Sequence, residues 1–355
     1  MNITSPQDAA SYICGKSIWS IRDKLSTEEA YNDIFATTLK RLAEIFKADL
    51  SKQRLDSVHL QSNMRHLGRI GLFVKTIKNF LHILKRQHRN HFDQLNKELI
   101  KRYLSKNTES LFASVKPSDS NHTLDQLATD LLPLTEHFSS VSTVQNMSTF
   151  KQLVRLFKEQ CIVESEAGDT IKKAVAKPNK DVSSDSLQNP SDPDAGYSNH
   201  KGKGYQAQVA ENYVETSTPD EKKKQLSLIT YIAVESADKH DANALLPAIE
   251  DLKERNVTPK ELLADSLYGS TSNWFDRRTG VKHLRVRGMK AVRFAVVMKA
   301  IGLNIFRASR HRKRTSRPKT PVIGNILACL ASFKYVKDQI LQSKELLLVT
   351  MKNGC

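Results

Sequence analysis

The sequence predicts an α/β protein, because two kinds of hydrophobic periodicity occupy different parts of the chain. From residue 70 to 103, apolar residues recur mostly every three or four positions, which is the spacing of one helix face. After about residue 204, YQAQVAENYV alternates as a strand does, and LSLITYIAVESA is a continuous apolar run typical of a buried central strand. We therefore expect a mixed sheet with flanking helices.

The first half of the chain is expected to be mostly helical. Residues 1–50 form a helical N-terminal piece whose second helix begins at STEEAYNDIF, where Ser26 and Glu29 have the spacing of a capping box. Residues 51–62 contain a short strand that carries Asp56. Residues 63–163 then form a large helical insertion, which we expect to be broken at SVKPSDSN and at Pro133.

The second half is expected to contain the rest of the sheet. Residues 164–203 have the polar composition of a long loop, and residues 204–306 supply two strands, a helix capped by Asp241, and a strand, ELLADSLYG, that ends near Asp265. Residues 307–355 are expected to be a basic tail and a C-terminal helix.

The charge of the chain points to a polyanionic partner. Among 355 residues, 55 Lys and Arg exceed 38 Asp and Glu, so the net charge is +17. Residues 277–319 hold fifteen Lys or Arg and no acid, so the excess is concentrated. Nucleic acid is the first expectation and an anionic membrane surface the second. No apolar run approaches the roughly 20 residues that span a bilayer, so we expect a cytoplasmic, nucleoid-associated protein without a membrane span.

Cysteine and histidine do not indicate a metal site. The four cysteines, Cys14, Cys161, Cys329 and Cys355, are scattered without a CxxC pair, and we expect reduced, mostly buried thiols. The histidines at 82, 88 and 91 lie in a basic helical stretch, where solvent-facing or DNA-facing side chains are expected rather than ligands.

The order of the elements fits a ribonuclease H-like core. In that fold one carboxylate lies on the first strand and another at the end of the fourth strand, and the two are side by side despite their distance in sequence. Asp56 and Asp265 occupy these two positions in the expected order of elements. Two divalent metals roughly 4 Å apart can activate a nucleophile and stabilise the leaving oxygen of a phosphodiester, and clustered carboxylates hold such cations.

Four blocks make this expectation specific: RLDSVHLQSNMRHLGRIGLF, SLQNPSDPDAGYSNHKGKGYQAQVAENY, LLADSLYGS and RTGVKHLRVRGMKAVRFAVVMKAIGLNI. In this order they resemble successive blocks of the DDE transposases of bacterial insertion sequences, over much of residues 50–306. The resemblance implies that Asp56 and Asp265 are the first and second catalytic acids. It also implies a two-metal site for Mg²⁺ or Mn²⁺, and DNA as partner, both as element ends and as target.

The sequence departs from this family at the third acid, a glutamate on a helix. No glutamate lies between residues 265 and 344, and STSN joins directly to WFDRRTG. We expect an internal deletion near residues 270–276 that removed the last core strand and the front of the catalytic helix, and a shortened N-terminal region. With one ligand fewer, the second cation is held loosely, so we expect an inactive copy that Asp276, the nearest substitute, does not rescue.

Each candidate residue also has a structural alternative. Asp56 and Asp265 could cap strands or pair with arginines. Asp192 and Asp194 in SDPDAGY could approach the metals, but Pro, Gly and Asp together favour a turn, which we rank first. His59 and His240 adjoin acids; contact with substrate and a packing or capping role are equally open.

The candidate DNA contacts are basic. Lys201 and Lys203 in HKGKGY form either a phosphate-binding loop or the entry to a hairpin. The remaining candidates follow Asp265 in the chain and would contact the DNA backbone: Arg285, Arg287, Arg310, Arg312, Lys313, Arg314 and Arg317. Three functions stay open. The first is an impaired transposase-derived DNA-binding protein, and the second is a working transposase or nuclease that recruits another acid. The third is a non-catalytic binding protein, for example an inhibitor that occupies element ends or forms mixed oligomers with an intact transposase. A homo-oligomer is a further possibility.

Overall fold

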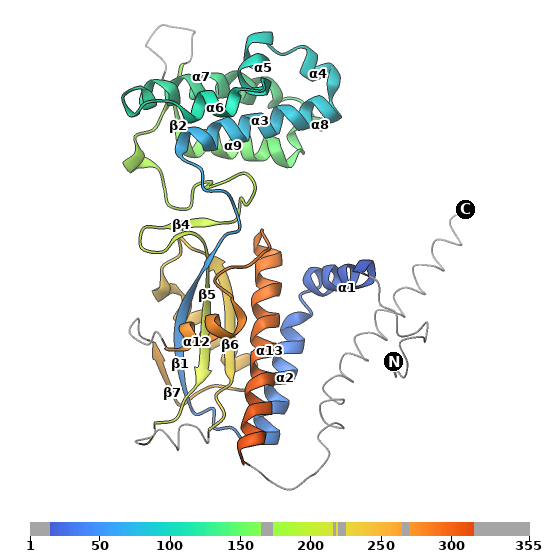
Figure 1. The fold of residues 1–355 in the computed structure, drawn as a ribbon, viewed down its shortest axis with the longest axis vertical. Helices are drawn as coiled ribbons and strands as arrows, with labels where there is room; N and C mark the ends of the chain where they lie inside the picture. Colours follow the sequence, from blue (N-terminus) through green and yellow to red (C-terminus); the bar gives the residue numbers. More distant parts are fainter. Residues whose placement is uncertain (1–14, 165–172, 216–217, 219–224, 265–269, 316–355) are drawn as a thin grey trace, which may run out of the picture.

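The structure is a computed structural model that describes residues 15–164, 173–215, 218, 225–264 and 270–315. A helical unit lies at one end of a sheet-containing unit (Figure 1). The helices are α1 (Gly15–Thr27), α2 (Tyr31–Phe46), α3 (Arg69–Gln87), α4 (Arg89–Asp93), α5 (Lys97–Leu104), α6 (Thr108–Ala113), α7 (Ser120–Phe138), α8 (Ser142–Gln145), α9 (Ser148–Gln160), α11 (Leu245–Glu254), α12 (Ser270–Thr279) and α13 (Met289–Thr315). The strands are β1 (Lys52–Gln61), β2 (Cys161–Glu164), β3 (Lys173–Ala176), β4 (Gly196–Ser198), β5 (Gly202–Asn212), β6 (Ile229–Ser236) and β7 (Glu261–Ala264).

The predicted α/β class is confirmed, and its sheet is mixed. Strand β5 lies antiparallel to β1, and β4 and β6 pair with the other side of β5, also antiparallel. Strand β7 pairs with β1 in parallel. The strand predicted within residues 51–62 is β1, which lies between β5 and β7. The two strands predicted after residue 204 are β5 and β6. Among the described strands β6 pairs with β5 alone, so the central position expected for its apolar run is wrong.

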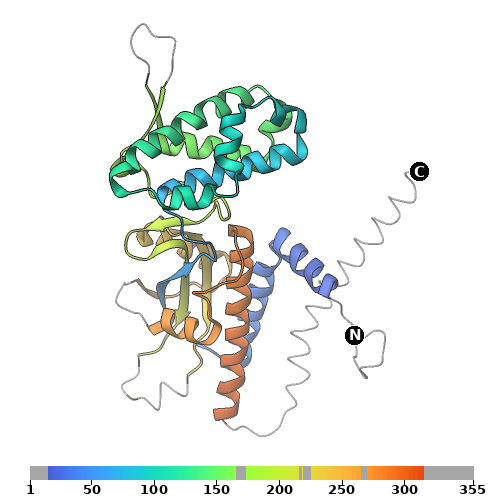
Figure 2. The same ribbon diagram turned by 45° about the horizontal axis from the view of Figure 1, so that its top comes forward.

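Helices cover both faces of this sheet. On one face, Val58, Val209 and Val234 pack with side chains of α2, α12 and α13, and Phe275 of α12 is fully buried there. On the other face, α11 places Ala248 and Leu252 against Leu55 and other strand residues. Seen from two directions, α13 and α2 run alongside each other on the first face (Figures 1 and 2).

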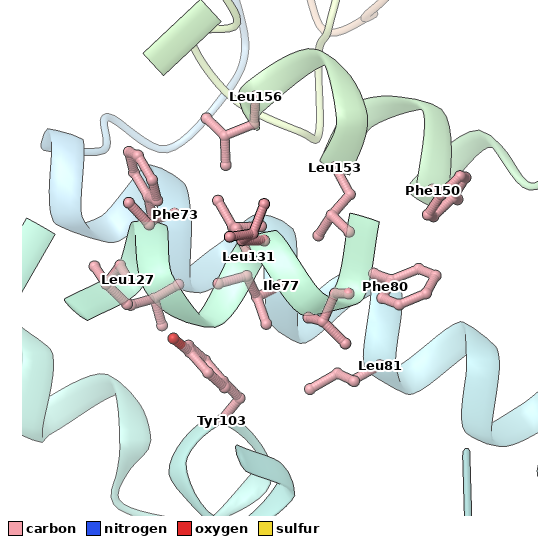
Figure 3. Packing of buried hydrophobic residues seen from close by; sticks show 14 of the residues in the cluster. Phe73, Ile77, Phe80, Leu81, Tyr103, Leu127, Leu131, Phe150, Leu153 and Leu156 are labelled. Carbon is pink, nitrogen blue, oxygen red and sulfur yellow. The ribbon is translucent and has the colours of Figure 1, made fainter. Parts of the chain in front are cut away.

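The helical unit has a hydrophobic core of its own. Leucine and phenylalanine side chains from α3, α7 and α9 fill its centre, and Tyr103 of α5 is buried beside them (Figure 3). The hydroxyl of Tyr103 donates to Asp130 at 2.6 Å, which satisfies this buried polar group. The apolar period read from residues 70–103 belongs to this core.

Two expectations about helix ends are wrong. The two N-terminal helices exist, but Ser26 lies within α1 and Glu29 adopts a left-handed φ of 51°, so neither caps α2. Asp241 does not cap α11 either: its carboxylate turns to Lys201, Ser57 and Gln208. In both places, contacts with distant residues replace the local cap expected from spacing alone.

The predicted breaks in the insertion are partly wrong. The chain does leave the helix at SVKPSDSN, where α6 ends and a short 3-10 turn at Pro117–Asp119 precedes α7. Pro133, however, lies inside α7, which continues to Phe138. Its neighbours Leu131, Leu132 and Leu134 are buried, and this tertiary packing outweighs the cost of a proline in the helix interior.

The polar segment at 164–203 contains regular structure that its composition did not predict. Strand β3 pairs antiparallel with β2, and β4 forms a hairpin with β5. Further along, α13 continues to Thr315, so the basic residues 310–314 extend a packed helix. No helix in the described ranges is long and apolar enough to cross a membrane.

Candidate functional site

Asp56 lies in the middle of the central strand. It is 8% exposed, and it shares its face of β1 with Val58 and Leu60, which are buried in the core under α12 and α13. Its Oδ1 accepts a hydrogen bond of 2.9 Å from the following backbone amide, that of Ser57. An acid on this face of a central strand is held rigidly, as metal ligands and catalytic groups require.

Strand β7 brings the chain close to Asp56. The parallel register pairs Leu55 with Ala264, the last residue of β7. Asp56 and Asp265 each follow a member of this pair in sequence. Asp265 itself lies outside the described residues, so the structure gives no position for its carboxylate.

Asp276, which the sequence predicts as the nearest substitute for the family's third acid, has a structural partner. It lies on α12, and its Oδ1 accepts a hydrogen bond of 3.0 Å from the backbone amide of Lys282. Its own carbonyl accepts from Gly280 at 2.6 Å. These bonds close the turn after α12, which gives the Asp276 carboxylate a role in the local fold.

The donor set for a divalent metal is small. Carboxylate oxygens such as those of Asp56 are ligands that Mg²⁺ and Mn²⁺ prefer. Within the described residues, however, no group of three or more His, Cys, Asp and Glu side chains is placed to hold a metal. Asp56 fits such a site as one ligand.

The opposite face of β1 carries a polar cluster that the sequence did not predict. Ser57 and Gln208 are paired across β1 and β5, and Asp241 accepts from both, at 3.1 and 3.3 Å. Lys201 approaches the same groups, at 3.2 Å from Asp241 and 3.1 Å from the Ser57 hydroxyl. Alternation along a strand places Ser57 and Asp56 on opposite faces, so this cluster is separate from the Asp56 site.

Burial and the nearby charges shift the pKa values of Asp241 and His59. Burial would raise the pKa of Asp241, but the hydrogen bond and charge of Lys201, with the bond from Ser57, outweigh it and lower that pKa. Burial, followed by the charges of Lys201 and Lys282, lowers the pKa of His59. Neither ring nitrogen of His59 has a hydrogen-bond partner among the described residues. His59 is therefore a neutral imidazole packed into the sheet.

The SDPDAGY segment forms the turn that its Pro, Gly and Asp residues predict. The carboxylate of Asp192 is fully buried and accepts from Tyr205, Gly288 and Ser62. Asp194 accepts from the backbone amide of Met289 at 2.8 Å, at the start of α13. His240 likewise has a capping role, because its Nδ1 accepts from the amide of Ala242 at 3.2 Å.

Lys201 and Lys203 flank the start of β5 in the hairpin with β4. Lys201 pairs with Asp241, and the half-buried Lys203 donates to the carbonyl of Leu67 at 3.0 Å. Burial lowers the pKa of Lys203. Gly204 lies where a side chain would meet the Leu60 carbonyl at 2.1 Å, so the glycine serves close strand packing.

The other predicted DNA contacts fall into two groups. Arg285 and Arg287 are exposed in the segment that follows α12, and this segment meets the end of β1 where the amide of Gln61 donates to Lys282. The second group lies on the last turns of α13: Arg310, Arg312 and Lys313 are exposed, and Arg314 follows them in the helix. Arg317 lies outside the described residues.

Sequence reasoning missed the cluster around Asp241 because its members are far apart in the chain. The one available signal was the alternation of Gln206 and Gln208 in β5, which places two amides on one face of a strand. No protein-family model, characterised protein or solved structure matches this chain.

Proposed function

We propose that the chain is a DNA-binding protein derived from a DDE transposase, with a ribonuclease H-like core that has lost strand-transfer activity. The strand arrangement supports this proposal. A central first strand lies antiparallel to the next core strand and parallel to a later one, β7, which is the order expected for such a core. The helical unit between β1 and β5 corresponds to the insertion expected after the first strand.

The observation that carries the proposal is the parallel pairing of β1 with β7. Because Ala264 is in register with Leu55, the next residues in the chain are the two acids that the transposase resemblance singles out, Asp56 and Asp265. This relationship favours a shared metal site over two separate strand caps.

Asp56 and Asp265 are the residues that would hold the divalent metals. When bound, Mg²⁺ or Mn²⁺ would supply electrostatic stabilisation of a phosphodiester under attack. The contribution of the chain is to hold Asp56 rigidly on a buried strand. The bond from the Lys282 amide to Asp276 favours loss of activity, because the only nearby replacement for the third acid already closes a turn.

Metal binding can be tested without any enzymatic activity. The protein is loaded with Fe²⁺ and treated with ascorbate and peroxide, so that radicals cut the backbone beside the metal. We expect cuts near residues 56 and 265 that excess Mg²⁺ suppresses and that Asp56→Ala removes, while Asp185→Ala keeps them. Cuts elsewhere, or an unchanged pattern in Asp56→Ala, would contradict the shared site.

DNA binding and catalysis need a second experiment. Anisotropy of a labelled duplex is followed over a salt series, and a supercoiled plasmid is incubated with Mg²⁺ or Mn²⁺. We expect salt-sensitive binding and no divalent-dependent nicking above that of Asp56→Ala. Nicking that Asp56→Ala abolishes would show a working enzyme, and absence of binding at low salt would refute the DNA-binding role. Selective binding of element ends without nicking would favour an inhibitor.

A further inference from the structure

A basic cavity of about 440 Å³ lies where the helical unit meets loops of the sheet-containing unit. Its walls come from the linker after β1, from α3, from the end of α6, from the loop at 189–191 and from Arg287 before α13. Its volume falls in the range of small-molecule sites. It is separate from the polar cluster at Asp241, because none of the residues of that cluster lines it.

The cavity is lined by positive charge. Arg65, Lys75, Lys78 and Arg287 contribute cations, and no Asp or Glu is among the described lining residues. Arg65, Lys75 and Arg287 form no ion pair within the described ranges. Like charges gathered in a concave site repel one another, and an anion relieves that repulsion.

The start of α3 adds to the positive electrostatic potential in the cavity. Its N-terminus opens at Gly68, a cavity residue that has no side chain to cap the first turn. The helix has 19 residues, so its N-terminal dipole and free amides also favour an anion. Gly71, Lys75 and Lys78 follow one another at i, i+4 and i+7, which places both lysines on the face that the glycine leaves open.

The rest of the lining is apolar. Leu67, Ile70, Val74 and Phe112 line the same cavity. A lone inorganic anion would leave this surface in contact with water, whereas a ligand with a flat ring beside its charge would cover it. Apolar surface next to phosphate-binding cations is the pairing that nucleotides require.

The walls of the cavity are held in place by hydrogen bonds with backbone groups. The buried Asn189 donates from Nδ2 to the carbonyl of Arg65 at 2.7 Å, and its Oδ1 accepts from the amide of Ser191 at 2.9 Å. Arg287 donates from Nε to the carbonyl of Asn63, which fixes the guanidinium at the rim. Such a preformed site loses little side-chain entropy on binding.

We infer that this cavity binds a nucleotide, with the phosphate among Arg65, Lys75, Lys78 and Arg287 and the base on the apolar wall. The nucleotide has two possible sources, a free mononucleotide and the terminal nucleotide of a DNA strand. Only the second source rests on the proposed function. The cavity and its charges stand independently of the Asp56 site.

Calorimetric titration of the full chain with dAMP and with inorganic phosphate tests this inference. We expect dAMP to bind more tightly than phosphate, since only dAMP covers the apolar wall. Lys75→Ala/Lys78→Ala removes two of the cations and should weaken dAMP binding by about tenfold or more. Lys97→Ala/Lys101→Ala removes the same charge from the exposed face of α5 and should leave the affinity unchanged.

A second variant tests the shape of the cavity without changing its charge. Ala113→Trp places a large side chain at an exposed lining position of α6, and it should weaken dAMP binding more than phosphate binding. Thermal unfolding of each variant checks that it is folded. Equal dAMP affinity in the wild type, the double lysine variant and Ala113→Trp would overturn the inference, as would absence of dAMP binding to the wild type.

Competition identifies the source of the nucleotide. Displacement of dAMP by a 5'-phosphorylated oligonucleotide, but not by its unphosphorylated form, would assign the site to a DNA strand end. If neither oligonucleotide displaces dAMP, the site would be assigned to a free nucleotide. The outcome is distinguishable from failure of the proposed function, because dAMP binding requires neither duplex DNA binding nor a metal at Asp56.

Discussion

Tyr205 donates its hydroxyl hydrogen to Oδ1 of Asp192 across a hydrogen bond of 2.5 Å. The same oxygen accepts from the backbone amide of Gly288 at 2.9 Å, and the other carboxylate oxygen accepts from Ser62. Asp192 thus joins β5, the linker after β1 and the loop before α13. Burial and the Asp192 charge raise the pKa of Tyr205, so its hydroxyl stays protonated and donates.

Asp192→Ala should destabilise the fold strongly, because the buried Tyr205 hydroxyl and two partly buried donors, Ser62 and Gly288, lose their acceptor together. We expect a loss of about 3 kcal/mol in the free energy of unfolding, measured in urea. Asp185→Ala changes an exposed acid nearby and should cost less than about 0.5 kcal/mol. Equal losses in the two variants would show that the junction does not depend on Asp192.

Glu211 is the second structural acid that can be tested. It is 2% exposed and accepts from Arg54 of β1 and from Arg307 of α13, in each case at 3.0 Å. Glu211→Gln leaves two partly buried guanidinium groups without their charge partner, which should cost about 3 kcal/mol in urea unfolding. In the control Glu215→Gln, an exposed pair with Lys52 is lost, and less than about 1 kcal/mol is expected.

His59 should make the protein sensitive to mild acid. Burial and nearby lysines lower its pKa, so the unfolded state binds the proton first as the pH falls. Stability is therefore lost as the pH falls below the ordinary histidine pKa of about 6.5, until the lowered folded pKa is passed. His59→Gln cannot take up the proton and should lose less stability between pH 8 and pH 5.5 than the wild type. Equal losses would refute this assignment.

Cys161 should not react with thiol reagents in the native protein. It is buried, and burial raises the pKa of its thiol to about 12. Since the thiolate is the reactive form, a variant that retains only Cys161, with Cys14, Cys329 and Cys355 changed to serine, should react with a thiol reagent only after denaturation. Rapid modification of the folded variant would contradict this.

The basic end of α13 should contribute to DNA affinity through counterion release. Arg312→Ala/Lys313→Ala should flatten the plot of log affinity against log salt by about 0.9 for each phosphate contact that is lost. Lys97→Ala/Lys101→Ala, which removes equal charge from α5, should leave the slope unchanged. An unchanged slope in the first variant would exclude this end of the helix from the DNA interface.

Periodicity was enough to predict the main strands and helices, because burial fixes which residues alternate. The continuous apolar run at LSLITYIAVESA is β6, and the alternation at YQAQVAENYV lies on β5. The position of β1 between β5 and β7 comes from the structure, because local sequence does not encode which strands are neighbours. Helix ends were predicted poorly, since Ser26 and Asp241 have partners that are remote in the chain.

The candidate site was predictable only in part. Asp56 and the end of β7 could be placed next to each other because strand order constrains them. The cluster of Ser57, Gln208 and Asp241 could not, because cross-strand partners depend on register, which no single segment encodes. The cavity lined by Arg65 and Lys75 depends on how two units meet, which local patterns do not specify either.

The insertion of the helical unit between β1 and β5 has a consequence for synthesis. The two strands lie side by side in the sheet, yet β5 leaves the ribosome only after the whole helical unit has been made. Local helical contacts form quickly, whereas pairing distant strands waits for closure of the intervening loop. We therefore expect the helices to fold first around their own core. Folding of the helical unit would bring its two ends closer together. The entropy cost of closing the loop between β1 and β5, which grows with the number of flexible residues, would then be smaller.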